Sequence, residues 1–137
     1  MKKFLILVFL IPFLSSCSGT GSKIIPNTSI NNDSTSTLYF SRTGGYVGGG
    51  VMASVKVNGT EIAKLGTKEY VQHVVSGSFN ITVSATGLNA FAMGGDSISG
   101  VGKKGSKHFY IIDVKAGLLQ AKFQINETTE SGFQNSQ

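Results

Sequence analysis

The sequence predicts an all-β domain, a small antiparallel β-sandwich of about seven or eight strands. Short apolar or alternating stretches are separated by turn residues about every 8 to 12 positions. Glycine supplies 18 of the 137 residues and only 14% are charged, which argues against a coiled coil or helical bundle. No window beyond residue 16 repeats apolar residues with the period of an amphipathic helix.

The chain opens with a segment typical of an exported protein. Lys2 and Lys3 precede a run of eleven residues without a polar side chain, Phe4 to Leu14. As a helix this run would span roughly 16 Å, about half of a bilayer core. It is therefore too short for a transmembrane anchor and is typical of a secretory signal.

The tetrad Leu14-Ser15-Ser16-Cys17 resembles the signal of bacterial lipoproteins, in which small residues precede a cysteine. The resemblance implies that residues 1–16 are a signal peptide, that the Cys17 thiol carries a diacylglyceryl group, and that the new amine is acylated too. Two or three acyl chains give stable anchoring. Ser18 after the cysteine resembles the family's outer-membrane sorting pattern. This implies a protein of the cell envelope that is anchored in the outer membrane and faces the periplasm. An ordinary signal peptide with an incidental cysteine is the alternative.

Residues 17–36 are expected to be a flexible tether between the lipid anchor and a folded head. Ser, Thr, Asn and Gly dominate this stretch, which cannot bury enough apolar surface to order itself. A flexible chain of this length has an end-to-end distance of roughly 25 Å. Ile24 and Ile25 are its only apolar pair, and we expect them to be the part able to dock on the head or the membrane surface.

The folded domain is assigned to residues 37–126, and its clearest element is a hairpin. Asn58-Gly59 joins two strands, because both residues tolerate the positive φ angles of a type I′ turn. Phe79, Ile81, Val83 and Ala85 alternate with polar residues, which predicts a half-buried strand. The strands before position 86 are expected at 36–42, 51–57, 60–65, 68–75 and 79–85, with a glycine-rich loop at 43–50 and a turn at Ser76-Gly77.

The second part of the domain begins with an irregular segment at 86–96 and a short strand at 97–101. Residues 107–115 are apolar on both faces, which predicts a central strand covered on both sides. A last strand is expected at 118–126, followed by a polar, loose tail at 127–137. In that last strand the residues expected to face inward are Leu119, Ala121, Phe123 and Ile125.

This order of elements resembles a family of small bacterial proteins of unknown function, many of them lipoproteins. Their domain is similar to PEGA and transthyretin-like β-sandwich modules. The segments that carry the resemblance are the hairpin at 51–65, the Gly turn and alternating strand at 76–85, and the Gly turn and aromatic strand at 105–113. The family usually has Pro-Gly where this chain has Ser76-Gly77. The resemblance implies a fold and a compartment, and it brings no catalytic residues.

Residues suited to catalysis or metal binding are sparse. His73 and His108 have no second ligand at metal spacing, so we expect surface or cross-strand histidines. A Ser/His/Asp triad would need Asp96 or Asp113, and no nucleophile-elbow motif surrounds a serine. The sequence therefore predicts a non-enzymatic protein without cofactor or metal.

The net charge of +5 does not indicate a nucleic-acid partner. Removing Lys2 and Lys3 with the signal leaves 10 basic against 7 acidic residues, or +3. No basic stripe with interleaved aromatic residues follows, so we expect no nucleic-acid binding.

Two loops and a basic turn are the candidate partner-binding sites. Aromatic and methionine side chains on loops suit partner binding, which favours an envelope protein as partner. The basic turn favours a cell-wall glycan or anionic lipid. The alternatives are that the apolar loop residues fold back to plug the sandwich and that the lysines are merely solvated. The candidates are Tyr46 in the loop 43–50, Leu88, Phe91 and Met93 in the segment 86–96, and Lys103 and Lys104 with Lys107 in the turn.

Overall fold

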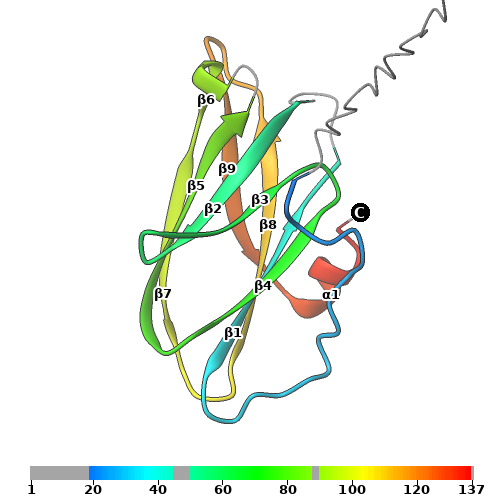
Figure 1. Cartoon of the computed structure of the whole chain (residues 1–137), viewed down its shortest axis with the longest axis vertical. Helices are drawn as coiled ribbons and strands as arrows, with labels where there is room; N and C mark the ends of the chain where they lie inside the picture. Colours follow the sequence, from blue (N-terminus) through cyan, green and yellow to red (C-terminus); the bar gives the residue numbers. More distant parts are fainter. Residues whose placement is uncertain (1–18, 45–49, 88–89, 137) are drawn as a thin grey trace, which may run out of the picture.

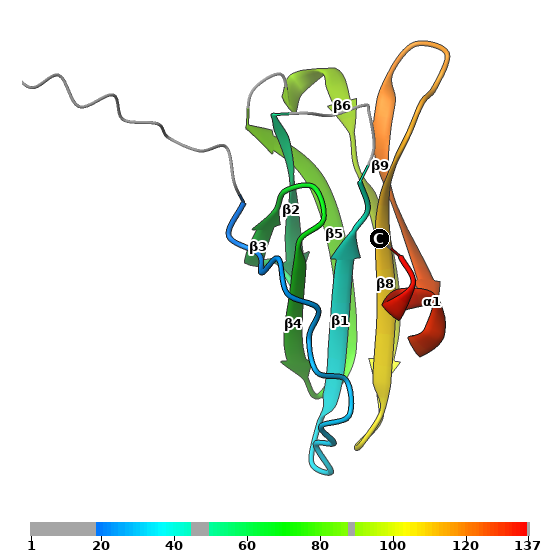
Figure 2. The ribbon, with the colours of Figure 1, turned by 90° about the vertical axis from the view of Figure 1, so that its right-hand side faces the viewer.

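The computed structural model describes residues 19–44, 50–87 and 90–136. Within them, nine strands form two sheets that face each other around a common apolar core (Figures 1 and 2). The predicted all-β, sandwich-like fold is confirmed. The elements are β1 (Ser36–Arg42), β2 (Val51–Val57), β3 (Thr60–Leu65), β4 (Tyr70–Val75), β5 (Gly77–Gly87), η1 (Ala90–Ala92), β6 (Met93–Gly94), β7 (Asp96–Gly102), β8 (Lys107–Lys115), β9 (Ala121–Thr128) and α1 (Glu130–Gln134).

The sheets correct the prediction of a wholly antiparallel sandwich. One sheet has the order β3-β2-β5-β7 and is antiparallel throughout, whereas the other has the order β4-β1-β8-β9-β6 and is mixed. In the mixed sheet β1 pairs in parallel with β8, and β6 pairs in parallel with β9. Apolar alternation shows which face of a strand is buried, but it carries no information about the direction of a partner distant in sequence.

The strand positions agree closely with the sequence pattern. The Asn58-Gly59 turn has positive φ angles of 50° and 81°, as the hairpin prediction requires. In β5 the side chains of Phe79, Ile81 and Val83 are buried, whereas Asn80 is exposed. The additional, ninth strand is the two-residue β6, which lies inside the segment 86–96 that we expected to be irregular.

The central position predicted for residues 107–115 is confirmed, because β8 lies between β1 and β9. Tyr110 and Ile112 belong to the core between the sheets, whereas Phe109 belongs to a second apolar cluster. Its partner β1 is buried along its whole length. Both strands therefore carry apolar side chains that are covered on both faces of the sheet.

The C-terminal residues differ from the loose tail that we expected. Thr129 caps α1 by accepting a hydrogen bond from the amide of Gly132 at 3.1 Å. Phe133 of α1 has no exposed surface, and the centre of its ring lies 5.5 Å from the centre of the Phe109 ring. One aromatic side chain in a polar segment is enough to hold the segment when a matching apolar surface exists. The second cluster consists of Tyr39, Tyr70, Phe109 and Phe133, with Ile25 packed against it.

The expected flexible tether is also docked over its first part, residues 19–28, which we call the strap. Ser22 and Tyr70 exchange two backbone hydrogen bonds of 2.8 and 2.9 Å, and the amide of Thr20 donates to Lys64 O at 2.7 Å. At the far end, the buried Thr28 donates to Glu130 of α1. The strap thus joins β3 and β4, which are one edge strand of each sheet, and covers one open side of the sandwich (Figure 2).

The strap fits because its glycines leave room. A Cβ atom on Gly19 would lie 2.1 Å from Lys64 O, and one on Gly21 would lie 2.5 Å from a methyl group of Leu65. Polar composition suggested disorder, but backbone hydrogen bonds to two free strand edges outweigh the missing apolar surface.

The start of β9 corrects the placement of Leu119. Phe123 and Ile125 face inward as predicted, and Ala121 is partly buried. Leu119, however, is 102% exposed, because β9 begins only at Ala121 and the preceding residues form the connection from β8. Leu118 is exposed in the same way.

Candidate functional site

The strand ends that flank three connections lie at one end of the sandwich, which we call the loop end. β1 ends at Arg42 and β2 starts at Val51, whose register partner is Gly87 at the end of β5. The flanks of the loop 43–50 therefore lie beside the start of the segment 86–92. Met93 of β6 pairs in parallel with Ala121 of β9, so η1 and the β8–β9 connection, residues 116–120, both lie at this end of the sheet (Figure 1).

The loop end carries an apolar tip formed by Phe91, Leu118 and Leu119. Their exposed fractions are 88%, 105% and 102%. Phe91 thus does not fold back to plug the sandwich, whereas Met93 is partly buried and packs against the core. Tyr46, Leu88 and Cys17, which the sequence also singled out, lie outside the described residues.

Two exposed lysines flank the β8–β9 connection, which carries Leu118 and Leu119. Lys115 and Lys122 lie opposite each other on β8 and β9, and both are exposed. The amide of Lys68 donates to Arg42 O, and the Lys68 side chain lies beside Gly44 at the same end.

The nearby carboxylates are used for internal hydrogen bonds. Asp113 accepts a hydrogen bond from Thr43 at 2.5 Å. Asp96 accepts from the amide of Ile125 at 3.1 Å and thereby links β7 to β9. Both aspartates keep their negative charge but are partly buried, whereas Lys115 and Lys122 are exposed next to the tip.

The structure separates the basic turn from the two loops. Lys103 and Lys104 are exposed in the connection from β7 to β8, at the end of the sandwich opposite the loop end (Figure 1). Lys107 instead donates to the backbone oxygen of Thr28 and holds the strap. Near this turn, a shallow groove of about 530 Å³ lies on β5 and β7, lined by Asn58, Ser78, Phe79, Asn80, Ser99, Gly100 and Val101.

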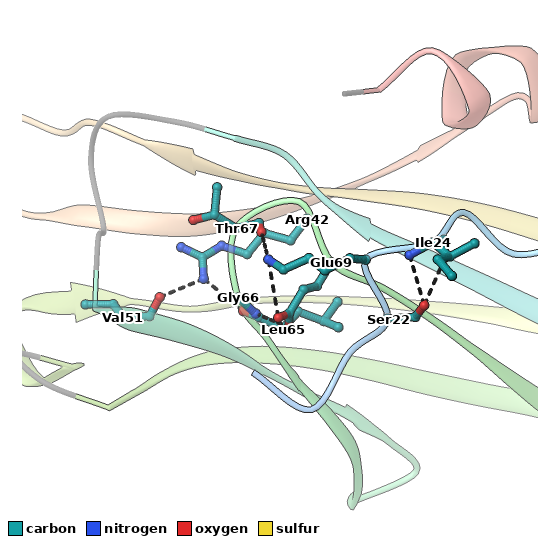
Figure 3. A network of polar contacts seen from close by, with 9 residues as sticks. Ser22, Ile24, Arg42, Val51, Leu65, Gly66, Thr67 and Glu69 are labelled. Carbon is teal, nitrogen blue, oxygen red and sulfur yellow. Dashed lines mark hydrogen bonds and ion pairs between the residues drawn. The ribbon is translucent and has the colours of Figure 1, made fainter. Parts of the chain in front are cut away.

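A buried polar cluster holds the strap and the loop end together (Figure 3). One guanidinium nitrogen of Arg42 donates to Val51 O at 2.6 Å and to Leu65 O at 2.8 Å, and the group lies 5.0 Å from the centre of the Phe123 ring. Glu69, which is 1% exposed, accepts from the amide of Gly66 at 2.7 Å.

Charges of opposite sign lie close together in this cluster. Burial lowers the pKa of Arg42, and the charge of Glu69 opposes that shift. Lys23 of the strap lies 3.4 Å from Glu69 and also donates to Thr67 O. The carboxylate thus ties the strap to the connection between β3 and β4.

A serine, a histidine and a glutamate are connected near the basic turn. His108 Nδ1 lies 2.9 Å from Glu127 Oε1, and His108 Nε2 lies 3.3 Å from Ser106 Oγ. This connectivity resembles a catalytic triad, with Glu127 in place of the aspartates that the sequence suggested. The Ser106 hydroxyl, however, lies 2.7 Å from Lys103 O and 2.9 Å from Ser36 Oγ.

The backbone around Ser106 is also engaged within the fold. Its amide donates to Lys103 O, and the amide of Gly105 donates to Thr35 O. These two amides are therefore directed away from an oxyanion next to the hydroxyl. The network closes one end of the sandwich, and His108 is a cross-strand histidine, as predicted.

Other site classes find little support in the described part of the chain. No group of three His, Cys, Asp or Glu side chains comes together there. No helix among these residues has the length and apolarity needed to cross a bilayer. A second open groove of about 530 Å³ lies between the strap and β4, with Ile24, Ile25, Pro26 and Tyr70 among its lining residues.

Sequence reasoning missed Leu118 and Leu119 as surface residues. Two adjacent apolar residues cannot both face inward on a strand, since its side chains alternate. The pair also follows Ala116-Gly117 directly and lies between Lys115 and Lys122. This pattern in the sequence could have predicted an exposed apolar turn.

Comparison with protein families, with curated proteins and with solved structures finds no match to this chain. The resemblance to PEGA and transthyretin-like modules therefore stays a prediction.

Proposed function

We propose that this chain is a lipid-anchored, non-enzymatic protein of the bacterial cell envelope, and that it acts as an interaction or structural accessory module. The loop end is its contact surface. The observation that carries this proposal is the apolar tip, because large apolar side chains gathered at full exposure mark interaction sites.

Anchoring through Cys17 is supported by the sequence around it. The apolar run ends at Leu14, small residues follow, and Cys17 is the only cysteine of the chain. The first described residue, Gly19, lies two positions later and is already packed on the body of the domain. A lipid on Cys17 would therefore hold the domain close to the membrane, which we expect to be the outer membrane on its periplasmic side.

A non-enzymatic role is supported by how the polar side chains are used. The Arg42–Glu69 cluster binds backbone groups of the fold. In the Ser106–His108–Glu127 network, the Ser106 hydroxyl donates to Lys103 O of its own turn. Each cluster has a structural role that its hydrogen bonds explain.

Glycan or cell-wall polymer binding is the alternative function. The groove on β5 and β7 favours it, since Asn80 donates to Ser99 there and amides and hydroxyls suit sugar recognition. The exposed Lys103 and Lys104 belong to the connection that leaves β7.

Photo-crosslinking in cells tests both functions with one design. A photoreactive residue replaces Phe91 at the tip or Ser99 in the groove of the full-length chain, expressed at native level. We expect adducts from position 91, because the tip is the contact surface. Mass spectrometry then identifies the adduct and any lipid on Cys17.

Position 99 is the matched control, and Cys17→Ser tests the anchor. The Cys17→Ser variant should leave the membrane fraction and lose the adduct from position 91. Adducts from position 99 alone, with a glycan mass, would replace the proposal with the alternative. An unmodified Cys17 would contradict the anchoring.

A further inference from the structure

The apolar tip combines side chains of two connections that lie at the same end of the five-stranded sheet. Phe91 precedes Met93 by two residues, and Leu119 precedes Ala121 by two residues. Met93 and Ala121 are register partners in a parallel pair, so Phe91 and Leu119, which precede them, both lie beyond the same end of the five-stranded sheet. The β8–β9 connection projects beyond the other elements at this end (Figures 1 and 2).

This shape suits a bilayer better than a protein partner. A stable protein interface buries about 800 Å² on each partner, over a broad patch. The three side chains of the tip offer much less area than that. They are, however, well placed to enter the boundary between lipid headgroups and acyl chains, where apolar side chains of membrane-surface proteins lie.

The charge around the tip matches an anionic membrane. Lys115 and Lys122 lie just behind the apolar tip on neighbouring strands, and Lys68 lies on the same end. Lysine stems can pack along apolar surface while their ammonium groups reach phosphate groups. The tip therefore combines apolar side chains with the charge that an anionic headgroup layer attracts.

The opposite end of the sandwich has lysines without a comparable apolar tip in the described part of the chain. Lys103 and Lys104 are exposed there. Near the same end Ile30 is 64%, Val74 48% and Val101 59% exposed. They belong to three different segments and are less exposed than the side chains of the tip. The loop end is therefore the end that suits insertion.

The docked strap would hold the start of the folded domain close to a lipid on Cys17. A free tether would leave the domain roughly 25 Å from its anchor. With Gly19 packed against Lys64, Gly66 and Glu69, only two residue steps, about 7 Å of extended chain, separate it from Cys17. The start of the strap lies in the half of the molecule that carries the loop end (Figures 1 and 2).

We propose that Phe91, Leu118 and Leu119 insert into an anionic phospholipid bilayer, with Lys115 and Lys122 at the headgroups. The inference rests on the proposed function and names the partner of its contact surface. The lipid on Cys17 and the apolar tip are then two attachment points that fix the orientation of the domain on the membrane.

A single tryptophan tests the insertion, because the chain contains no natural one. The full-length, lipidated Leu119→Trp chain is reconstituted into vesicles of phosphatidylglycerol and phosphatidylethanolamine, with or without bromine on the acyl chains. We expect the tryptophan of the vesicle-bound chain to emit at a shorter wavelength than that of the chain in detergent-free buffer. Brominated lipid should quench this emission. In the Leu119→Trp background, Lys115→Gln with Lys122→Gln should weaken the quenching.

Val101→Trp is the matched control, since Val101 is also exposed but lies toward the opposite end. Its emission should be the same with and without brominated lipid. Both substitutions are at exposed positions, and unfolding in urea verifies that the variants fold. Mass spectrometry of the same samples reports the lipid on Cys17, so failure of anchoring and failure of insertion are distinguishable.

Three results would overturn the proposal. One is a vesicle-bound Leu119→Trp chain whose emission brominated lipid does not quench. Another is equal quenching of the two tryptophans, which indicates unspecific adsorption. The third is a protein adduct from position 91 in cells, which would assign the tip to a protein partner.

Discussion

Arg42 shows how one buried charge organises several segments of this protein. Its guanidinium donates to backbone oxygens of Val51 and Leu65, which belong to two neighbouring strands of the opposite sheet. Its backbone also bonds to Glu69 and Lys68. The residue is only 3% exposed, so these hydrogen bonds are formed away from water, where an acceptor without a donor is costly.

We predict that Arg42→Met lowers the free energy of unfolding by about 3 kcal/mol. The substitution removes the donor from two backbone oxygens and leaves the buried Glu69 without the positive charge of Arg42. Urea unfolding measures the loss. Lys56→Met, at an exposed position of β2, is the control and should change the value by less than about 0.5 kcal/mol. Equal effects of the two substitutions would show that the cluster contributes little.

At the scale of elements, the strap and α1 turn a half-covered sheet into one with apolar packing on both faces. The rings of Tyr39 and Phe109 stack on the outer face of the five-stranded sheet, with their centres 5.1 Å apart. Phe133 packs on both, and Ile25 of the strap packs against the same cluster. Two polar segments at opposite ends of the chain therefore complete the domain by covering the same surface.

We predict that Phe133→Ala destabilises the protein by about 3 to 5 kcal/mol, as the loss of a buried phenylalanine does in other cores. Phe91→Ala removes the same atoms from an exposed position and should have an effect below about 0.5 kcal/mol. Thermal or urea unfolding compares them. Should Phe133→Ala fail to fold, Phe133→Leu is expected to cost about 1 kcal/mol and keeps the comparison measurable. A Phe133 variant as stable as the Phe91 variant would contradict the packing of α1.

On the scale of the whole molecule, three tyrosines are buried in the two apolar clusters. Burial raises the pKa of Tyr110 and of Tyr70 above the usual value of 10.0, and burial together with the charge of Glu130 raises that of Tyr39. In the unfolded chain these hydroxyls ionise near pH 10, whereas in the folded chain they stay protonated to higher pH. The folded state therefore loses stability relative to the unfolded state as the pH rises above 10.

We predict that the stabilisation linked to these tyrosines is fully present below pH 9 and is lost as the pH rises from 10 to 12, so that the free energy of unfolding falls over that range. Urea unfolding across that range measures the fall. Phenolate absorbance gives a second readout, because these tyrosines should ionise together with unfolding rather than before it. Ionisation of all tyrosines near pH 10 in a folded protein would contradict the burial of the hydroxyl groups.

The sequence by itself determined the strand positions, the Asn58-Gly59 turn and the inward residues of β5 and β8. These features depend on the alternation of apolar and polar residues and on the backbone preferences of single residues. Both can be recognised within a short stretch of sequence. The exposed Phe91 in a loop was also a candidate from sequence.

Only the tertiary structure decided how distant segments meet. The parallel pairing of β1 with β8, the docking of the strap on β3 and β4, and the burial of Phe133 join residues far apart in the chain. The same holds for the apolar tip, which combines Phe91 with Leu118 and Leu119. Composition marked the strap and the tail as too polar to order themselves, but their order comes from surfaces that other elements provide.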